Sequence, residues 1–205
     1  MKRFLALILV LLLLPAIPVM AADGYAEVVA PKYDDAKMFS EGLAPVKSGD
    51  KWGFVDTSGN EIVPPMYDNT YGFSDGLAPV YLNGKWGFID KTGNVVIDMQ
   101  YEYARSFHHG LATVSRKGKW GFIDTAGNEV IPLAYDETIP FYGSDLAAVE
   151  KGSKWGFVDK SGNLVVEPKY AAVISFSDGC DLAPVQLDGK VGFMPHRQDP
   201  ACPSH

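Results

Sequence analysis

The stretch Lys51-Trp52-Gly53-Phe54-Val55-Asp56 decides the fold, because it recurs almost unchanged along the chain. Its copies begin at Lys85, Lys119, Lys154 and Lys190, the last of them weaker because Val191 stands in place of tryptophan. In the four complete copies, a tyrosine is the fifteenth residue after the tryptophan. A motif repeated with a fixed period is the signature of a tandem repeat protein.

Two kinds of turn divide each repeat into strands. The residue pairs directly before the motif are Gly49-Asp50, Asn83-Gly84, Lys117-Gly118, Gly152-Ser153 and Asp188-Gly189. Glycine in second place favours a type I′ turn and glycine in first place a type II′ turn, the two tight hairpin turns. The Asp-x-x-Gly-Asn sequence after the motif favours a type I turn closed by a glycine with positive φ. The pattern therefore predicts three antiparallel strands per repeat.

Alternation along the motif strand places Trp and Phe on one face, with Gly and Ile or Val on the other. A unit this small cannot bury its own apolar face, so we expect a core shared between adjacent repeats. We expect glycines such as Gly53 to leave a gap that a side chain of the neighbouring unit fills. Pro31, Pro65 and Pro168 are expected to end the third strand. The predicted core residues are Trp52, Trp86, Trp120, Trp155, Phe54, Phe88, Phe122, Phe157, Tyr67, Tyr101, Tyr135 and Tyr170.

The two ends of the repeat array differ. The chain begins with a third strand at Glu27-Val28-Val29-Ala30-Pro31 and finishes with the first two, at 182–185 and 191–194. The expected fold is all-β, with five tandem antiparallel three-stranded meander units of about 34 residues. We prefer a compact propeller-like closure, in which the first strand completes the last unit, to an open β-repeat array, which stays an alternative.

The first 22 residues have the three parts of a secretory signal peptide. Lys2 and Arg3 precede an apolar run, and the small residues Ala21 and Ala22 close the stretch. Cleavage near Ala21 or Ala22 would leave a secreted or periplasmic protein with no membrane span, and an uncleaved anchor is the alternative. Loss of two basic residues would change the net charge from −7 to −9, which argues against nucleic acid as a partner. The predicted domains are the signal at 1–22, repeats at 23–195 joined at about 52, 86, 120, 155 and 191, and a tail at 196–205.

The motif copies at 51–56, 85–90, 119–124 and 154–159 resemble the WG repeat, also called the KWG repeat, of bacterial proteins. The resemblance covers roughly residues 26–194. It implies a repeat-built β structure, often exported or envelope-associated, with a role in interaction. It supplies no catalytic residues, and Val191 and Met194 depart from its pattern.

Candidate binding residues lie in the loops between the Phe and the Gly-Leu-Ala or Leu-Ala segments, where repeat length varies. They are Glu41, Asp75, His109, Tyr142, Ser144 and Asp178. The recurring acidic residues among them suit either a cationic partner or Ca²⁺, or are solvated surface charges. The aspartates that open the second turn, such as Asp56, are interpreted as caps of backbone amides. Cys180 and Cys202 form a disulfide in an oxidising compartment or are free thiols.

The sequence predicts neither a cofactor, a metal site nor a catalytic residue, since nucleotide, zinc-protease and triad signatures do not occur in it. We expect an exported non-catalytic module that binds or scaffolds a protein, a peptide or an envelope polymer. The alternative is a hydrolase of envelope glycan or peptide that uses the loop carboxylates. The ligand and the oligomeric state stay open.

Overall fold

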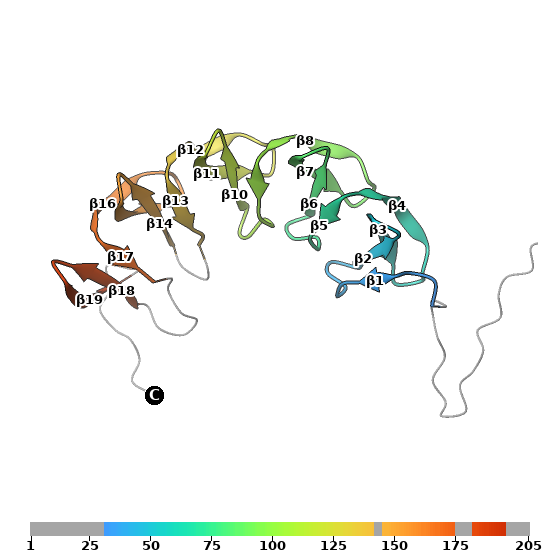
Figure 1. The fold of residues 1–205 in the computed structure, drawn as a ribbon, viewed down its shortest axis with the longest axis horizontal. Coiled ribbons are helices and arrows are strands. Elements are labelled where there is room, and N and C mark those ends of the chain that lie inside the picture. The colour runs from blue at the N-terminus through green and yellow to red at the C-terminus, as the bar shows by residue number, and fades with distance from the viewer. Residues whose placement is uncertain (1–30, 142–144, 175–181, 196–205) are drawn as a thin grey trace, which may run out of the picture. The chain divides into compact units, whose positions relative to one another are not determined.

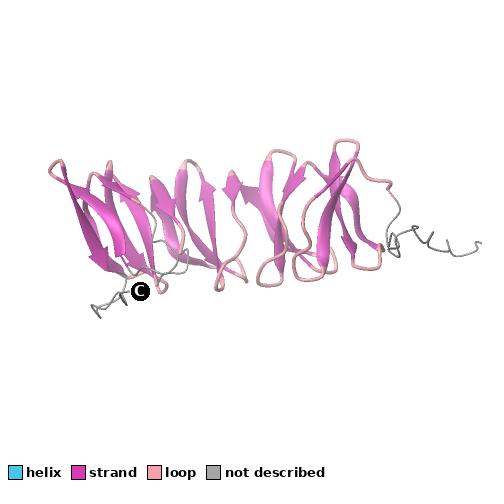
Figure 2. Ribbon diagram, turned by 90° about the horizontal axis from the view of Figure 1, so that it is seen from below, coloured by secondary structure: helices cyan, strands magenta, loops and turns pink. Residues whose placement is uncertain are grey.

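A computed structural model describes residues 31–141, 145–174 and 182–195. These residues form nineteen β-strands and no helix. The strands make five antiparallel sheets that follow one another along the chain (Figure 1), and only loops and turns connect them (Figure 2). The predicted signal peptide, residues 27–30 of the strand predicted at 27–31 and the tail at 196–205 lie outside the described residues.

Each sheet is a meander in which strands pair in chain order, and we number the sheets 1 to 5. The first strand of each sheet is short: β1 (Asp35–Ala36), β5 (Asn69–Thr70), β9 (Tyr103–Ala104), β13 (Glu137–Ile139) and β17 (Ala172–Val173). The second carries the Leu-Ala-x-Val segment: β2 (Leu43–Ser48), β6 (Leu77–Leu82), β10 (Leu111–Arg116), β14 (Leu146–Lys151) and β18 (Leu182–Leu187).

The third strand carries the Trp-Gly motif and ends in the Asp-x-x-Gly-Asn turn. The third strands are β3 (Lys51–Asp56), β7 (Lys85–Asp90), β11 (Lys119–Asp124), β15 (Lys154–Asp159) and β19 (Lys190–Pro195). The fourth strand runs through to the tyrosine of the repeat. The fourth strands are β4 (Glu61–Tyr67), β8 (Val95–Tyr101), β12 (Glu129–Tyr135) and β16 (Leu164–Tyr170).

The prediction of three-stranded units is wrong for sheets 1 to 4, which have four strands, and sheet 5 has three, in the order β17-β18-β19. The additional strand is the short first one. After Tyr67 and Asp68 the chain enters the next sheet, where Asn69 pairs with Tyr81 and Thr70 with Val80. Strands of two or three residues are too short to show an alternating pattern, so sequence periodicity does not reveal them. Closure of the array stays a prediction.

The two-residue hairpin turns have the types that their residues predict, with one exception. In sheet 2 both Asn83 and Gly84 have positive φ, as a type I′ turn requires. In sheet 4 both Gly152 and Ser153 have positive φ, so this turn is also type I′ and the predicted type II′ turn is wrong there. Serine tolerates the left-handed conformation less well than asparagine or glycine, and the two-residue connection imposes it.

The motif glycine has a different role from the predicted one. A Cβ atom at Gly53 would lie 2.3 Å from the carbonyl oxygen of Val63 and 2.6 Å from the nitrogen of Pro65, both in the backbone of β4. The β3–β4 ladder shifts register there, so β4 bulges over the glycine. The gap is filled by backbone of the same sheet and not by a side chain of the neighbouring unit. Pro65 lies in this bulge, where no ladder donor is needed, and does not end the strand.

The apolar core lies between consecutive sheets. Phe88, Ile97 and Tyr101 of sheet 2 pack against Phe107 and Val114, which belong to sheet 3 and the loop within it. The same arrangement joins sheet 1 to sheet 2, sheet 3 to sheet 4 and sheet 4 to sheet 5. Each sheet from 2 to 4 thus buries two apolar faces, one against each neighbour. Each sheet gains its interior from the sheets beside it.

Candidate functional site

The residue four positions after the tyrosine of each repeat lies beside the first strand of the following sheet. This position holds Lys37, Tyr71 and Arg105 in sheets 1 to 3. The backbone amide of each donates a hydrogen bond to the second strand, at 2.9 Å for Lys37, 3.2 Å for Tyr71 and 3.0 Å for Arg105. Because the repeat fixes this backbone, two cations and an aromatic ring occupy matching places in consecutive sheets.

Aromatic rings lie between the side chains at this repeat position. The ring of Tyr71 stacks on Trp86 with centroids 5.4 Å apart and planes inclined by 13°. Trp86 also contacts Tyr103, at 6.4 Å, and Tyr103 lies 5.2 Å from Trp120. A run of rings therefore passes from sheet 2 into sheet 3. Stacked and tilted rings at these distances attract one another beyond the apolar area that they bury.

Two cations lie over rings of this run, Lys37 over Tyr71 and Arg105 over Tyr103. The Lys37 ammonium is 4.5 Å from the centre of the Trp52 ring and 5.3 Å from that of Tyr71, and it donates a 2.5 Å hydrogen bond to the carbonyl of Thr70. The Arg105 guanidinium lies 5.7 Å from the centre of the Tyr103 ring. We call Lys37, Tyr71, Trp86, Tyr103 and Arg105 the basic–aromatic cluster.

Burial perturbs the cluster's titrating groups. It lowers the pKa of Lys37, an effect that the nearby carboxylate of Asp35 partly opposes. Burial also raises the pKa of Tyr71, and Tyr103 raises it further. Both shifts have desolvation as their first cause, so the cluster is a partly water-excluded environment in which charge interactions are stronger than in bulk water.

Two cavities open beside Arg105. The larger, of about 420 Å³, is lined by Tyr71, Tyr103, Arg105, Ser106 and His108. Two tyrosines, an arginine, a histidine and a serine thus line one space of the size of a small ligand site.

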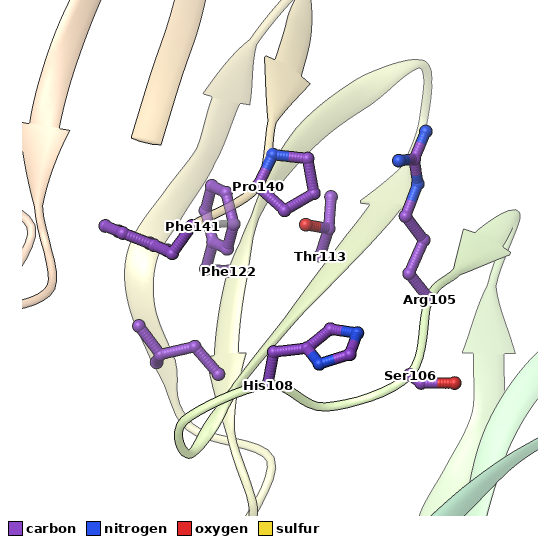
Figure 3. A pocket seen from close by; sticks show the side chains of 8 residues that line it. Arg105, Ser106, His108, Thr113, Phe122, Pro140 and Phe141 are labelled. Carbon is purple, nitrogen blue, oxygen red and sulfur yellow. The ribbon is translucent and has the colours of Figure 1, made fainter. Parts of the chain in front are cut away.

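The smaller cavity, of about 30 Å³, is drawn in Figure 3 and shares Arg105, Ser106 and His108 with the larger one. Thr113 lines it, and its buried hydroxyl makes no hydrogen bond within the described residues. A space of this volume beside a polar atom holds about one water molecule.

The predicted core aromatics are buried to different degrees. Trp52, Trp86, Tyr67 and Tyr101 are buried, as are the four motif phenylalanines. Trp120, Trp155, Tyr135 and Tyr170, which belong to sheets 3 and 4, are half-buried. Trp86 belongs both to the core and to the basic–aromatic cluster.

The acidic loop residues couple neighbouring sheets. The carboxylate of Glu41 accepts a 3.1 Å hydrogen bond from the amide of Gly76, thirty-five residues on, and pairs with Lys91 at 2.9 Å. In the same way Asp75 accepts a 2.7 Å bond from the amide of Gly110. His109 holds the equivalent turn position in sheet 3 and has positive φ like the two acids. In the structure Glu41 and Asp75 therefore accept hydrogen bonds from a turn of the next sheet and so link neighbouring sheets.

The turn aspartates cap backbone amides, as predicted. One oxygen of Asp90 accepts bonds from the amides of Thr92 and Asn94, both at 2.9 Å, and from the Thr92 hydroxyl at 2.6 Å. The Thr92 hydroxyl contributes most to lowering the pKa of Asp90, which falls to about 2. Asp56, Asp124 and Asp159 make the same amide bonds, and their pKa values are also lowered, chiefly by the side chain of the asparagine that ends each turn.

The remaining predicted residues lie outside the described part of the chain. These are Tyr142, Ser144 and Asp178 of the loops and the two cysteines, Cys180 and Cys202. Within residues 31–141, 145–174 and 182–195, no three His, Cys, Asp or Glu side chains gather in a way that suits a metal ion. The same ranges contain no helix that is both apolar and long enough to cross a bilayer.

The family described as WG containing repeat matches five consecutive segments: residues 26–52, 52–86, 86–120, 120–155 and 155–190. The chain belongs to the WG-repeat family. Its four complete motif copies provide the third strands of sheets 1 to 4. No curated protein matches this WG-repeat chain.

Solved β-propeller structures resemble the fold of this WG-repeat chain. Hsv2 of Kluyveromyces lactis is 12% identical with a TM-score of 0.52, over 83% of this chain and 64% of that one. Hsv2 of Kluyveromyces marxianus is 13% identical with a TM-score of 0.50, over 82% and 64%. A eukaryotic initiation factor is 11% identical with a TM-score of 0.52, over 84% and 55%. The WG-repeat chain spans less than two thirds of these proteins, and the likeness is one of fold.

Apart from Trp86, the residues of the basic–aromatic cluster were not among those singled out from the sequence. One signal of it is visible there, since Lys37, Tyr71 and Arg105 occupy one repeat position at intervals of 34 residues. That position precedes the phenylalanine of the repeat by two residues, and its importance depends on the short first strands, which the sequence pattern does not show.

Proposed function

We propose that this WG-repeat chain is an exported, non-catalytic binding module that holds an acidic sugar unit of an envelope polymer at the basic–aromatic cluster. The observation that carries the proposal is the cavity where Tyr71 and Tyr103 present aromatic surface beside Arg105 and His108. Export rests on the signal-like residues 1–22.

The chemistry of the cavity favours a ligand with both an apolar ring face and a negative charge. A pyranose ring has C–H faces that pack on the ring of a tyrosine, and its hydroxyls can bond to Ser106. A carboxylate on the ring would pair with the planar guanidinium of Arg105, which suits bidentate contacts. The net charge of the whole chain is −7, so a local basic site distinguishes this surface from the rest.

Geometry also suits an extended polymer. The cluster begins at Lys37 beside sheet 1 and contacts Trp120 of sheet 3 through Tyr103, so its rings and cations extend over three sheets. A chain of sugar units could contact more than one ring and more than one cation. The sequence also predicts a protein or a peptide as a possible partner. No observation of comparable weight favours either of these over a polymer.

The alternative function, a hydrolase that uses loop carboxylates, finds less support. Such an enzyme needs two carboxyl groups that face a sugar bond, about 5 to 9.5 Å apart. The described loop carboxylates, Glu41 and Asp75, accept hydrogen bonds from turn amides of the next sheet instead.

The proposal is tested by titrating the purified protein with an oligogalacturonate while the tryptophan fluorescence is recorded. Trp86 lies in the cluster, so binding should change the emission. The methyl ester of the same oligosaccharide keeps the ring and removes the charge, and it should bind more weakly by about tenfold, the equivalent of about 1.4 kcal/mol.

Matched variants locate the site. Arg105→Gln and Tyr71→Ala should each weaken binding by about tenfold, since a cation–π or charged contact at a partly buried site contributes about 1–2 kcal/mol. Lys151→Gln removes the same charge from an exposed position in sheet 4 and should leave binding unchanged. Equal affinity for the oligosaccharide and its ester, or equal losses in all three variants, would contradict the proposal.

A further inference from the structure

The smaller cavity beside Arg105 lies where sheet 3 meets the loop that precedes the second strand of sheet 4. Its lining includes Thr113 of β10, Phe122 of β11 and Phe141 of that loop. The rings of Phe122 and Phe141 are buried, with centres 5.2 Å apart. The cavity therefore belongs to the apolar joint between two sheets, where buried polar groups are normally hydrogen-bonded.

Thr113 places a hydroxyl in this joint that the fold does not need. The same repeat position holds residues without a polar side chain in the other four sheets: Pro45, Pro79, Ala148 and Pro184. Thr113 is 2% exposed, and its hydroxyl has no hydrogen-bond partner within the described residues. Because a buried polar group without a partner lowers stability, this hydroxyl indicates a partner that is not part of the chain.

His108 departs from the repeat at the same joint. Ser40 and Ser74 hold its position in sheets 1 and 2. The hydroxyl of each serine donates a 2.5 Å hydrogen bond to a phenylalanine carbonyl of the next sheet, thirty-three residues on. His108 brings an imidazole there instead, and this side chain lines the cavity together with Thr113 and Arg105 (Figure 3). Three residues that differ from their counterparts in sheets 1 and 2 thus line one space.

The two cavities beside Arg105 have three lining residues in common, Arg105, Ser106 and His108. The larger cavity adds the rings of Tyr71 and Tyr103. The smaller one, of about 30 Å³, adds a threonine hydroxyl and has room for about one water molecule. A ligand in the larger cavity can therefore place one more atom of the size of an oxygen in the smaller one.

We infer that one carboxylate oxygen of the bound acidic sugar enters the smaller cavity and accepts a hydrogen bond from the Thr113 hydroxyl. This inference rests on the proposed function. The oxygen takes the place of about one water molecule, and the second carboxylate oxygen faces the Arg105 guanidinium, whose planar fork suits a carboxylate. A hydrogen bond from a hydroxyl to a charged oxygen is stronger than one to a neutral group. The ligand thus supplies the partner that the hydroxyl lacks in the free chain.

The size of the smaller cavity also selects among acidic sugars. A carboxylate is planar and has two oxygens to place, one towards Thr113 and one towards Arg105. A sulfate or phosphate ester has three terminal oxygens in a tetrahedral arrangement, and a space of about one water molecule does not admit such a group. The site should therefore prefer uronic acids to sulfated or phosphorylated sugars.

Replacement of Thr113 by valine tests the role of the hydroxyl, because valine has a similar shape and no polar atom. The free variant should unfold at a urea concentration no lower than the wild type, since the hydroxyl has no partner to lose. Its affinity for the oligogalacturonate should fall by about tenfold. Thr113→Ser keeps the hydroxyl and should bind as the wild type does. An equal loss in the serine variant would overturn the inference.

Thr138→Val is the matched control. Thr138 is buried in β13, and its hydroxyl also lacks a hydrogen-bond partner within the part of the chain that the structure describes. It lines neither cavity beside Arg105. This variant should resemble Thr113→Val in stability and bind the oligogalacturonate as the wild type does. Equal losses of affinity in the two valine variants, or no loss in Thr113→Val, would overturn the inference.

A sulfated galactan oligosaccharide of the same length measures the selectivity. The wild type should bind it more weakly than the oligogalacturonate by about tenfold, and Thr113→Val should bind it as the wild type does. Equal affinity of the wild type for both would overturn the inference alone, since both are acidic sugars. Uronate binding that depends on Arg105 and Tyr71 but not on Thr113 would do the same. A wild type that binds neither would contradict the proposed function as well.

Discussion

The ring of Phe88 lies 4.8 Å from the ring of Phe107, centre to centre, and this contact joins sheet 2 to sheet 3. Both side chains are fully buried, although they lie nineteen residues apart in different sheets. The contact shows how the repeat gains stability, since the core of each sheet consists partly of residues from the next one.

Replacement of Phe107 by alanine should lower the free energy of unfolding by about 3–5 kcal/mol, the usual cost of removing a buried aromatic side chain. Phe39→Ala is the matched control, because it changes the same repeat position where the side chain is half-exposed. Its effect should be within about 0.5 kcal/mol in dilute protein. Urea denaturation measures both, and equal losses would show that the contact between sheets adds nothing.

Gly87→Ala should destabilise the protein by about 1–3 kcal/mol, because the new methyl group would overlap the backbone of β8. The added Cβ would lie 2.6 Å from the carbonyl oxygen of Ile97, and backbone cannot move aside as a flexible side chain does. Gly192→Ala, which meets open space, should leave the stability of the monomer nearly unchanged. A similar loss in both variants, measured by thermal unfolding at low concentration, would contradict the bulge as the reason for the glycine.

Low pH should reduce the stability that the Asp-x-x-Gly-Asn turns contribute to the fold. The pKa of Asp90 is lowered to about 2 in the folded chain, first by the Thr92 hydroxyl, while an unfolded aspartate titrates near 3.9. A lowered folded pKa means that the stabilisation is complete above about pH 4 and is lost as the pH falls towards about 2. The difference in urea midpoint between wild type and Asp90→Asn should therefore shrink over this interval. A difference that stays constant down to pH 2 would refute the assignment.

Asp75→Asn should reduce stability by about 0.5–1 kcal/mol, since it replaces a charge-assisted bond to the Gly110 amide by a neutral one at an exposed position. Asparagine tolerates the positive φ of this turn, so the backbone should be unaffected. The same variant should bind the oligogalacturonate as well as the wild type does. Weaker oligosaccharide binding would instead show that Asp75 contacts the ligand, as the sequence suggested.

Sequence reasoning succeeded where structure is local. The Asp-x-x-Gly-Asn turn depends on five adjacent residues, and both the amide caps of Asp56 and the positive φ of Gly59 agree with the prediction. It failed where the cause lies elsewhere in the chain. Gly53 is explained by the bulge of β4, ten residues later, and the short first strand of each sheet by a pairing of two or three residues.

The basic–aromatic cluster was missed for the same reason. Lys37 and Tyr71 are 34 residues apart, and no local pattern shows that they meet. The acidic loop residues were recognised as a recurring set, but their recurrence reflects the link between sheets that Asp75 makes to Gly110. In a repeat protein, a residue that recurs at one repeat position can serve the joint between units as readily as a ligand.

Amide hydrogen exchange of Phe107→Ala, resolved sheet by sheet with mass spectrometry, tests most directly whether neighbouring sheets share their cores. The side chain belongs to sheet 3 but is buried among residues of sheet 2, so exchange should accelerate in β6–β8 as well as in β9–β12. Acceleration confined to sheet 3, with sheet 2 exchanging as in the wild type, would contradict the account.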